Sequence, residues 1–209
     1  MIPVKILALQ YIPNATEDLC DALQIPRNTP SLGLVTTDSD DATYIALDEA
    51  TKAAEVQVSF SRSFYAGASN SSTPHAGEVI GILSAATPGA MRSGMAAMEN
   101  ALQRIGFEEV VGVPYLAHTV SSCGSFLSKE AGVQQGASLA YLIAPPLEAI
   151  MGLDAALKAA DVRLCKLYAP PTETNFGGGL LTGTQSACTA ACDAFAAAVR
   201  KIANHPIER

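Results

Sequence analysis

ALDEATKAAEVQV at residues 46–58 and GLDAALKAADVRL at residues 152–164 are two versions of one sequence. Each carries an aspartate, a lysine four positions later and two alanines directly after the lysine. The matching charged residues are Asp48 and Lys52 in the first stretch and Asp154 and Lys158 in the second. Self-similarity at a fixed spacing is the sequence signature of a repeated structural unit. The chain is therefore predicted to contain two copies of one domain.

The match extends upstream, where SLGL at residues 31–34 corresponds to SLAY at residues 138–141. Two domains of about 100 residues each are within the usual size range for domains. We expect the first domain at residues 1–107 and the second at residues 108–209, with the junction inside residues 106–114. No low-complexity linker separates the halves, so the two domains are expected to pack together.

Both halves show the same alternation of apolar strands and amphipathic helices. In the first half we expect strands at residues 4–11, 32–36, 56–60 and 78–83 and helices at residues 16–23, 40–54 and 88–105. In the second half we expect strands at residues 115–120, 139–144, 162–168 and 180–182 and helices at residues 127–131, 147–160 and 186–202. The order βαβαββα, present twice, predicts an α/β fold, sandwich-like, in which helices pack on a sheet.

The composition favours a protein that makes extensive subunit contacts. The chain is 49% hydrophobic and only 16% charged, whereas about 25% is typical. Exposed apolar surface usually marks an interface. The net charge is −7 and basic residues are not clustered, which disfavours nucleic acid as a partner. No apolar stretch is long enough for a membrane span, and residues 1–5 do not resemble a secretory signal, so a cytoplasmic location is expected.

The cysteines and glycines do not indicate catalysis or a cofactor. Five cysteines without CxxC spacing are expected to be small buried side chains. A structural zinc site would need more thiolates or histidines at matching spacing. The glycine-rich residues 176–179 are followed by neither Gly-Lys-Ser/Thr nor a GxGxxG helix start, so they do not form a phosphate loop. No nucleophile and base are paired in the sequence, and we expect no catalytic residues.

Several longer blocks together resemble a known family. They are SLGLVTTDSDDATYIALDEATKAAEV (31–56), RSFYAG (62–67), AGEV (76–79), AYLIAPPLEA (140–149), DAALKAADV (154–162), PPTETNF (170–176) and LTGTQSAC (181–188). These blocks resemble bacterial microcompartment shell proteins with tandem domains, and most closely those of the EutL family of ethanolamine-utilization compartments. The resemblance covers nearly the whole chain in order. The chain differs from the family pattern near residues 106–114, where it is shorter, and at Ser121-Ser122-Cys123-Gly124.

The resemblance implies two circularly permuted shell domains and a homotrimer whose six domains imitate a hexagon. Such trimers tile with other shell proteins into a sheet. Lys52 and Lys158 would then lie at the tile edge, where an ammonium group can donate up to three hydrogen bonds to carbonyls of a neighbouring tile. Without the resemblance, both lysines would be solvated side chains on a helix face.

The resemblance also implies small pores that can hold ethanolamine. The residues assigned to such a pore are Asp40, Asp41, Glu78, Phe107, Thr174, Asn175 and Phe176. Carboxylates accept hydrogen bonds from an ammonium group and repel anions, and aromatic faces attract cations. From the residue types alone, two aspartates at a helix start would be helix caps.

A central pore and a metal site are further expectations from the resemblance. Tyr65 and Phe107 would line a central opening that can be open or closed. Glu148 matches a position associated with a metal ion, although one carboxylate is a poor zinc site. No cofactor is required, and the sequence leaves open whether cobalamin docks at the central opening.

Two other functions remain as alternatives to the shell protein. A small lyase or transferase could use the three acidic residues Asp40, Asp41 and Glu78 as acid and base. A small-molecule sensor with two pseudo-symmetric domains would form a discrete oligomer and no sheets.

Overall fold

The computed structural model describes residues 1–64, 75 and 77–207, which form two compact units. The first unit contains residues 3–105 together with residues 124–127, and the second contains residues 1–2, 106–123 and 128–209. The short helix α4 (Ser125–Ala131) therefore begins in the first unit and ends in the second. The domain boundary between residues 107 and 108, which the repeat predicts, stays a prediction.

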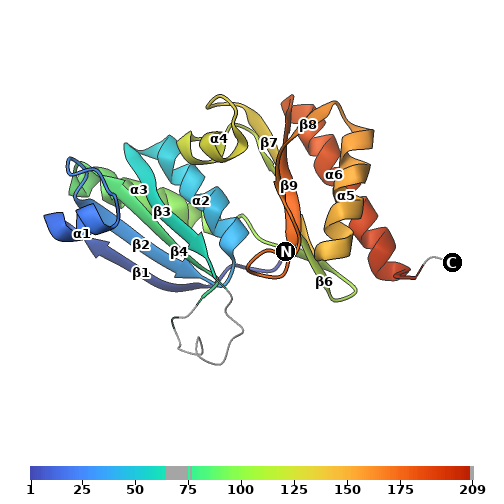
Figure 1. Cartoon of the computed structure of the whole chain (residues 1–209), viewed down its shortest axis with the longest axis horizontal. Helices are drawn as coiled ribbons and strands as arrows, with labels where there is room; N and C mark the ends of the chain where they lie inside the picture. Colours follow the sequence, from blue (N-terminus) through green and yellow to red (C-terminus); the bar gives the residue numbers. More distant parts are fainter. Residues whose placement is uncertain (65–74, 76, 208–209) are drawn as a thin grey trace. The chain divides into compact units, whose positions relative to one another are not determined.

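The first unit is an antiparallel sheet with helices packed on it (Figure 1). Its strands are β1 (Ile6–Ile12), β2 (Ser31–Thr37), β3 (Val56–Ser63) and β4 (Val79–Ala85), in the spatial order β1-β2-β4-β3. Its helices are α1 (Glu17–Ala22), α2 (Asp40–Ala53) and α3 (Pro88–Leu102). Helices α2 and α3 pack against each other and on the sheet, whereas Cys20 of α1 packs with Ile25, Leu32 and Ile82 in a separate buried cluster.

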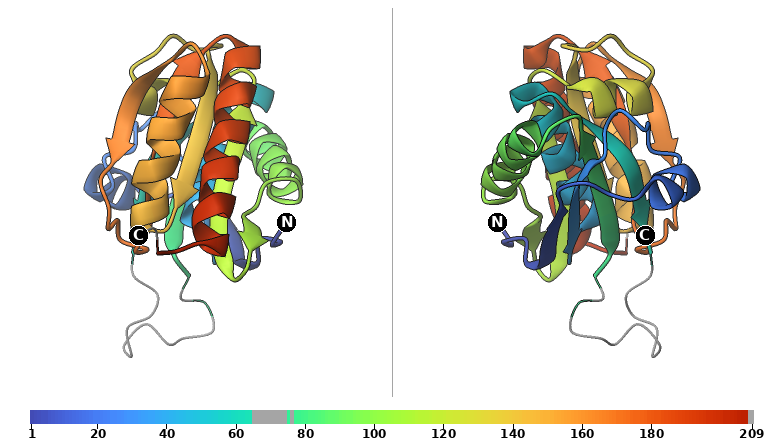
Figure 2. Two further views of the ribbon diagram at one scale, coloured as in Figure 1. Left: turned by 90° about the vertical axis from the view of Figure 1, so that its right-hand side faces the viewer. Right: turned by 90° about the vertical axis from the view of Figure 1, so that its left-hand side faces the viewer.

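The second unit repeats this arrangement. Its strands are β5 (Glu108–Val110), β6 (Val113–Val120), β7 (Ser138–Ala144), β8 (Val162–Tyr168) and β9 (Gly177–Gly183), in the order β5-β6-β7-β9-β8. Helices α5 (Pro146–Ala159) and α6 (Gln185–Asn204) lie side by side on one face of this sheet (Figure 2). Gly152 lets them approach closely, because a Cβ there would lie 2.6 Å from the Phe195 ring.

The predicted order βαβαββα is confirmed in both halves, with one additional strand, β5. Sequence patterning missed β5 because three residues are too short to show a strand period. Strand β9 begins at Gly177, three residues before the strand predicted at residues 180–182. Gly178 is required there, because its φ is 158° and a Cβ would lie 1.8 Å from the Leu142 carbonyl oxygen.

The turn between β5 and β6 places a valine in the left-handed region. Val110 pairs with Val113, which leaves Val111 (φ 50°) and Gly112 (φ 77°) as a two-residue hairpin turn. Such turns favour Asn-Gly because both central residues need positive φ. A β-branched residue in this conformation costs about 1–2 kcal/mol.

Replacing Val111 by asparagine is expected to raise the free energy of unfolding by about 1 kcal/mol, because asparagine tolerates positive φ. Val111 is 70% exposed, so the substitution removes little packing. Urea denaturation measures the difference. Val111→Ile is the matched control and should not raise the free energy of unfolding, because isoleucine keeps the branched Cβ. An equal increase in both variants would show that Val111 is not strained in this turn.

Candidate functional site

In the first unit, the acidic residues gather where three neighbouring strands end or begin. Asp38 and Asp40 follow β2, and Glu78 directly precedes β4. Thr37 and Ser63, the last residues of β2 and β3, both pair with Val79 across the sheet. The register therefore brings Glu78 beside the start of α2. We call Asp38, Asp40, Asp41 and Glu78 the acidic cluster.

Hydrogen bonds fix the backbone and one carboxylate of the acidic cluster. The Glu78 amide donates to the Thr37 carbonyl at 2.8 Å. The Asp41 amide donates to Asp40 Oδ1 at 2.8 Å, so Asp40 acts on its own helix start as a cap residue does. The Ser63 hydroxyl also bonds the Asp40 carboxyl. The Tyr44 hydroxyl lies 2.5 Å from Ser63 Oγ and holds that serine in place.

Burial and mutual repulsion make the acidic cluster hard to ionise fully. Asp40 is 6% exposed and Asp41 is 7% exposed. Burial raises the pKa of Asp40, although the bonds from Ser63 and Asp41 oppose the shift. Burial, with the charges of Asp40 and Asp38, raises the pKa of Glu78 to about 7. Near neutral pH Glu78 is therefore partly protonated, and a cation could replace its proton.

The aromatic and amide candidates lie together in the second unit. The rings of Phe107 and Phe176 are 5.4 Å apart and tilted by 58°. Thr174 and Asn175 occupy the tight loop before β9, in which the Thr172 amide donates to the Phe176 carbonyl at 2.8 Å. Asn175 has a φ of 66° and is exposed. This aromatic group and the acidic cluster belong to different units, so one shared pore lining stays a prediction.

The remaining predicted residues lie apart from these two groups. Lys52 forms an ion pair with Glu49, and Lys158 forms one with Asp154 at 2.6 Å. Glu148 is in the first turn of α5 and is half-buried. Within the described part of the chain, no three His, Cys, Asp or Glu side chains are grouped to hold a metal ion. Tyr65 lies outside the described residues.

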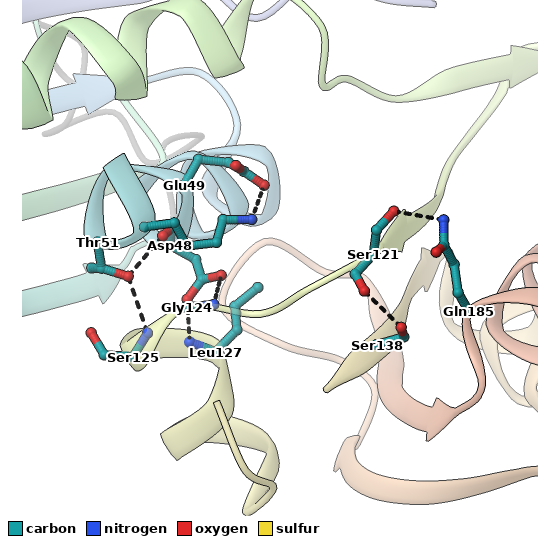
Figure 3. A network of polar contacts seen from close by, with 10 residues as sticks. Asp48, Glu49, Thr51, Ser121, Gly124, Ser125, Leu127, Ser138 and Gln185 are labelled. Carbon is teal, nitrogen blue, oxygen red and sulfur yellow. Dashed lines mark hydrogen bonds and ion pairs between the residues drawn. The ribbon is translucent and has the colours of Figure 1, made fainter. Parts of the chain in front are cut away.

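A buried aspartate to which the sequence analysis assigns no role connects α2 to the start of α4 (Figure 3). The Asp48 carboxylate accepts hydrogen bonds from the Gly124 amide at 2.6 Å and the Leu127 amide at 2.8 Å. Thr51 Oγ1 accepts another from the Ser125 amide at 3.1 Å. Asp48 is fully buried, and burial raises its pKa while the two amides oppose that shift. The recurrence of this aspartate in both repeats was the signal that could have identified it.

Figure 3 also shows how the second unit holds the chain that leaves β6. The Ser138 hydroxyl donates to the Ser121 carbonyl at 2.7 Å, and the Gln185 amide group donates to Ser121 Oγ at 3.1 Å. Ser121 is therefore bound from both β7 and α6. These contacts fix residues 121–123, which lead into the segment that Asp48 binds.

Comparison with known proteins shows one consistent set of relatives. The BMC domain family matches residues 31–117, from the first residue of β2 into β6. The bacterial microcompartment shell protein EutL of Clostridium perfringens (strain 13 / Type A) is 53% identical over 211 residues, covering 99% of this chain and 97% of the relative. The protein of the same name from Escherichia coli (strain K12) is 46% identical over 213 residues, covering 100% and 97%.

A solved structure agrees with this chain over its whole length. The crystal structure of ethanolamine utilization protein EutL from Leptotrichia buccalis C-1013-b matches with a TM-score of 0.95 and 53% identity, covering 100% of this chain and 98% of that chain. Among the described residues, no helix has the length and apolar character needed to cross a membrane.

Replacing Asp48 by alanine is expected to lower the free energy of unfolding by about 2–4 kcal/mol, because two buried amides lose their acceptor. Thermal and urea denaturation measure the loss. The control is Asp193→Ala on α6, which removes an exposed aspartate and should change stability by less than about 0.5 kcal/mol. Equal losses of stability in the two variants would show that the hydrogen bonds of Asp48 do not stabilise the fold.

Proposed function

This chain belongs to the EutL family of bacterial microcompartment shell proteins, and we propose that three copies form one six-domain tile with small openings for metabolites. As a family member it is a structural component of the shell and not an enzyme, so the lyase or transferase alternative is dropped. Proteins of this kind oligomerise and assemble with other shell proteins.

The duplicated architecture supports the trimer. Each chain supplies two units of the same element order, so three chains supply six similar units around one axis. Closed rotational symmetry is the usual form of soluble oligomers. Several large apolar side chains are exposed on the single chain, including Leu147 at 59% and Met151 at 50%. Side chains of this kind are commonly buried when subunits associate.

The acidic cluster supports passage or retention of a small organic cation such as ethanolamine. The observation that carries this proposal is Glu78, whose pKa is raised to about 7 beside the buried Asp40 carboxyl. An ammonium group that replaces the proton of Glu78 would relieve the repulsion and donate charge-assisted hydrogen bonds to the carboxylates. The same negative charge disfavours anions. Selection by size and charge needs no cofactor.

The second unit carries groups of the kind that can bind the alcohol of ethanolamine. Thr174 and Asn175 carry hydroxyl and amide groups that can bond an alcohol. Phe107 packs against Phe176, and we assign both rings to the small opening, where their faces would attract the ammonium group. A central opening lined by Tyr65 and Phe107, and a metal ion at Glu148, remain secondary proposals.

Ethanolamine is expected to bind about tenfold more tightly at pH 8 than at pH 6, because Glu78 must lose its proton to receive the cation and its pKa is about 7. Isothermal titration calorimetry across this pH range measures the change. Glu78→Gln should weaken binding and remove the pH dependence. Glu55→Gln, at an exposed position, is the control and should keep both the affinity for ethanolamine and its pH dependence. A pH-independent affinity in the unsubstituted protein would refute the role of Glu78.

Lys52→Ala combined with Lys158→Ala is expected to reduce two-dimensional arrays while leaving the trimer intact, because the tile edge loses ammonium donors. Negative-stain electron microscopy shows arrays, and light scattering gives the mass of the oligomer. Lys129→Ala serves as the control because it removes an exposed lysine elsewhere. Arrays of undiminished extent in the double variant would remove the edge assignment.

A further inference from the structure

One face of helix α2 binds residues 124–127 along its whole length. Tyr44, Asp48 and Thr51 are spaced at i, i+4 and i+7, so they share this face. Asp48 and Thr51 accept hydrogen bonds from backbone amides of residues 124–127 (Figure 3). Tyr44 contacts the same segment through Phe126, with 6.0 Å between the ring centroids and 51° between the ring planes. The face that holds this segment therefore begins at Tyr44.

The Tyr44 hydroxyl is also the first of two hydroxyls that lead to the Asp40 carboxyl. Its oxygen lies 2.5 Å from Ser63 Oγ, and the Ser63 hydroxyl bonds Asp40. A serine hydroxyl has one proton to donate, and an ionised carboxylate can only accept. Ser63 therefore donates to the ionised Asp40, and the hydrogen bond between the two hydroxyls must run from Tyr44 to Ser63. Each donation in such a chain strengthens the next.

This chain of hydroxyls favours the ionised form of Asp40. The bond from Ser63 lowers the pKa of the Asp40 carboxyl and so opposes burial, which raises it. The other charged groups of the acidic cluster, which are Asp38, Asp41 and Glu78, supply no positive charge. Asp40 therefore depends on hydrogen-bond donors to remain a carboxylate, and Tyr44 determines how one of these donors is held.

The second repeat has the same fold without this chain of hydroxyls. At the spacing of 106 residues that relates the two repeats, Tyr44 matches Ile150 and Asp40 matches Pro146. Neither of the matching side chains can donate or accept a hydrogen bond. The element order is nevertheless the same in both halves. The chain from Tyr44 to Asp40 is therefore not needed to build the domain, which indicates that it serves the acidic cluster.

We propose that residues 124–127 position the acidic cluster for cation binding, with Phe126 and Tyr44 as positioning residues. The Phe126 ring keeps Tyr44 in the orientation from which its hydroxyl donates to Ser63. Ser63 in turn holds the Asp40 carboxylate ready to accept hydrogen bonds from an ammonium group. This inference rests on the proposed binding of a small cation such as ethanolamine. It makes a site of the first repeat depend on residues that belong by sequence to the second.

Tyr44→Phe tests the chain in the full protein, because it keeps the ring and removes only the hydroxyl. Ethanolamine is expected to bind about three- to tenfold more weakly at pH 6, since the pKa of Asp40 rises and more of this carboxyl stays protonated. The difference should shrink at pH 8, where a larger share of Asp40 is ionised in both proteins. Isothermal titration calorimetry at the two pH values measures both affinities.

Tyr11→Phe is the matched control for this substitution. It removes a buried hydroxyl of the same unit that has no hydrogen-bond partner in residues 1–64, 75 and 77–207, so affinity and pH dependence should not change. Equal weakening of Tyr44→Phe at both pH values would indicate a general disturbance and overturn the proposal. Unchanged affinity of Tyr44→Phe at pH 6 would overturn it while leaving the cation site intact. An unsubstituted protein that does not bind ethanolamine would overturn both.

Phe126→Leu tests the part played by residues 124–127. It is expected to weaken binding at pH 6 as Tyr44→Phe does, whereas Phe126→Tyr keeps an aromatic ring and should retain the original affinity. Combining Phe126→Leu with Tyr44→Phe should weaken binding no further, because Phe126 acts through the Tyr44 hydroxyl. Additive losses would contradict this order of action, and an unchanged affinity in Phe126→Leu would show that residues 124–127 do not position the cluster.

Discussion

The buried Asp48 carboxylate is the interaction that holds residues 124–127 in the first unit. It lies on α2 of the first repeat and accepts amide hydrogen bonds from residues 124 and 127, which belong by sequence to the second repeat. A buried carboxylate without such donors would cost several kcal/mol, and the amides would be equally costly to leave unpaired. Each side of the contact therefore requires the other, and residues 124–127 join the compact unit of the first repeat.

Duplication followed by divergence explains why one chain has similar halves with dissimilar surfaces. The aspartate and the lysine four positions after it recur in both repeats. The matching aspartates nevertheless differ in burial, because Asp48 is fully buried whereas the side chain of Asp154 is 62% exposed. The element order is therefore preserved in both repeats, while the surroundings of matching side chains differ.

Much of the fold could be predicted from local sequence, because each strand and helix carries its own pattern. Residues 40–53 show helix periodicity and an acidic start, and the structure places α2 there. The bond between Asp48 and Gly124 could not be predicted in this way, because it joins residues far apart in the chain and depends on three-dimensional packing. Similarly, local sequence gives no sign that Asp40 and Asp41 differ from aspartates that cap an ordinary helix. Only the sheet register, which brings Glu78 beside them, makes them a cluster.

The acidic cluster opposes folding, which is an argument for its role in binding. Burial raises the pKa of both Asp40 and Glu78, so the folded state favours their protonated forms and loses stability as the pH rises toward neutrality and above. Neutral side chains at these positions would avoid that loss. The Tyr44 and Ser63 hydroxyls hold the Asp40 carboxyl in place but supply no positive charge. A small bound cation would supply that charge, which gives a physical reason to keep carboxylates where they destabilise the protein.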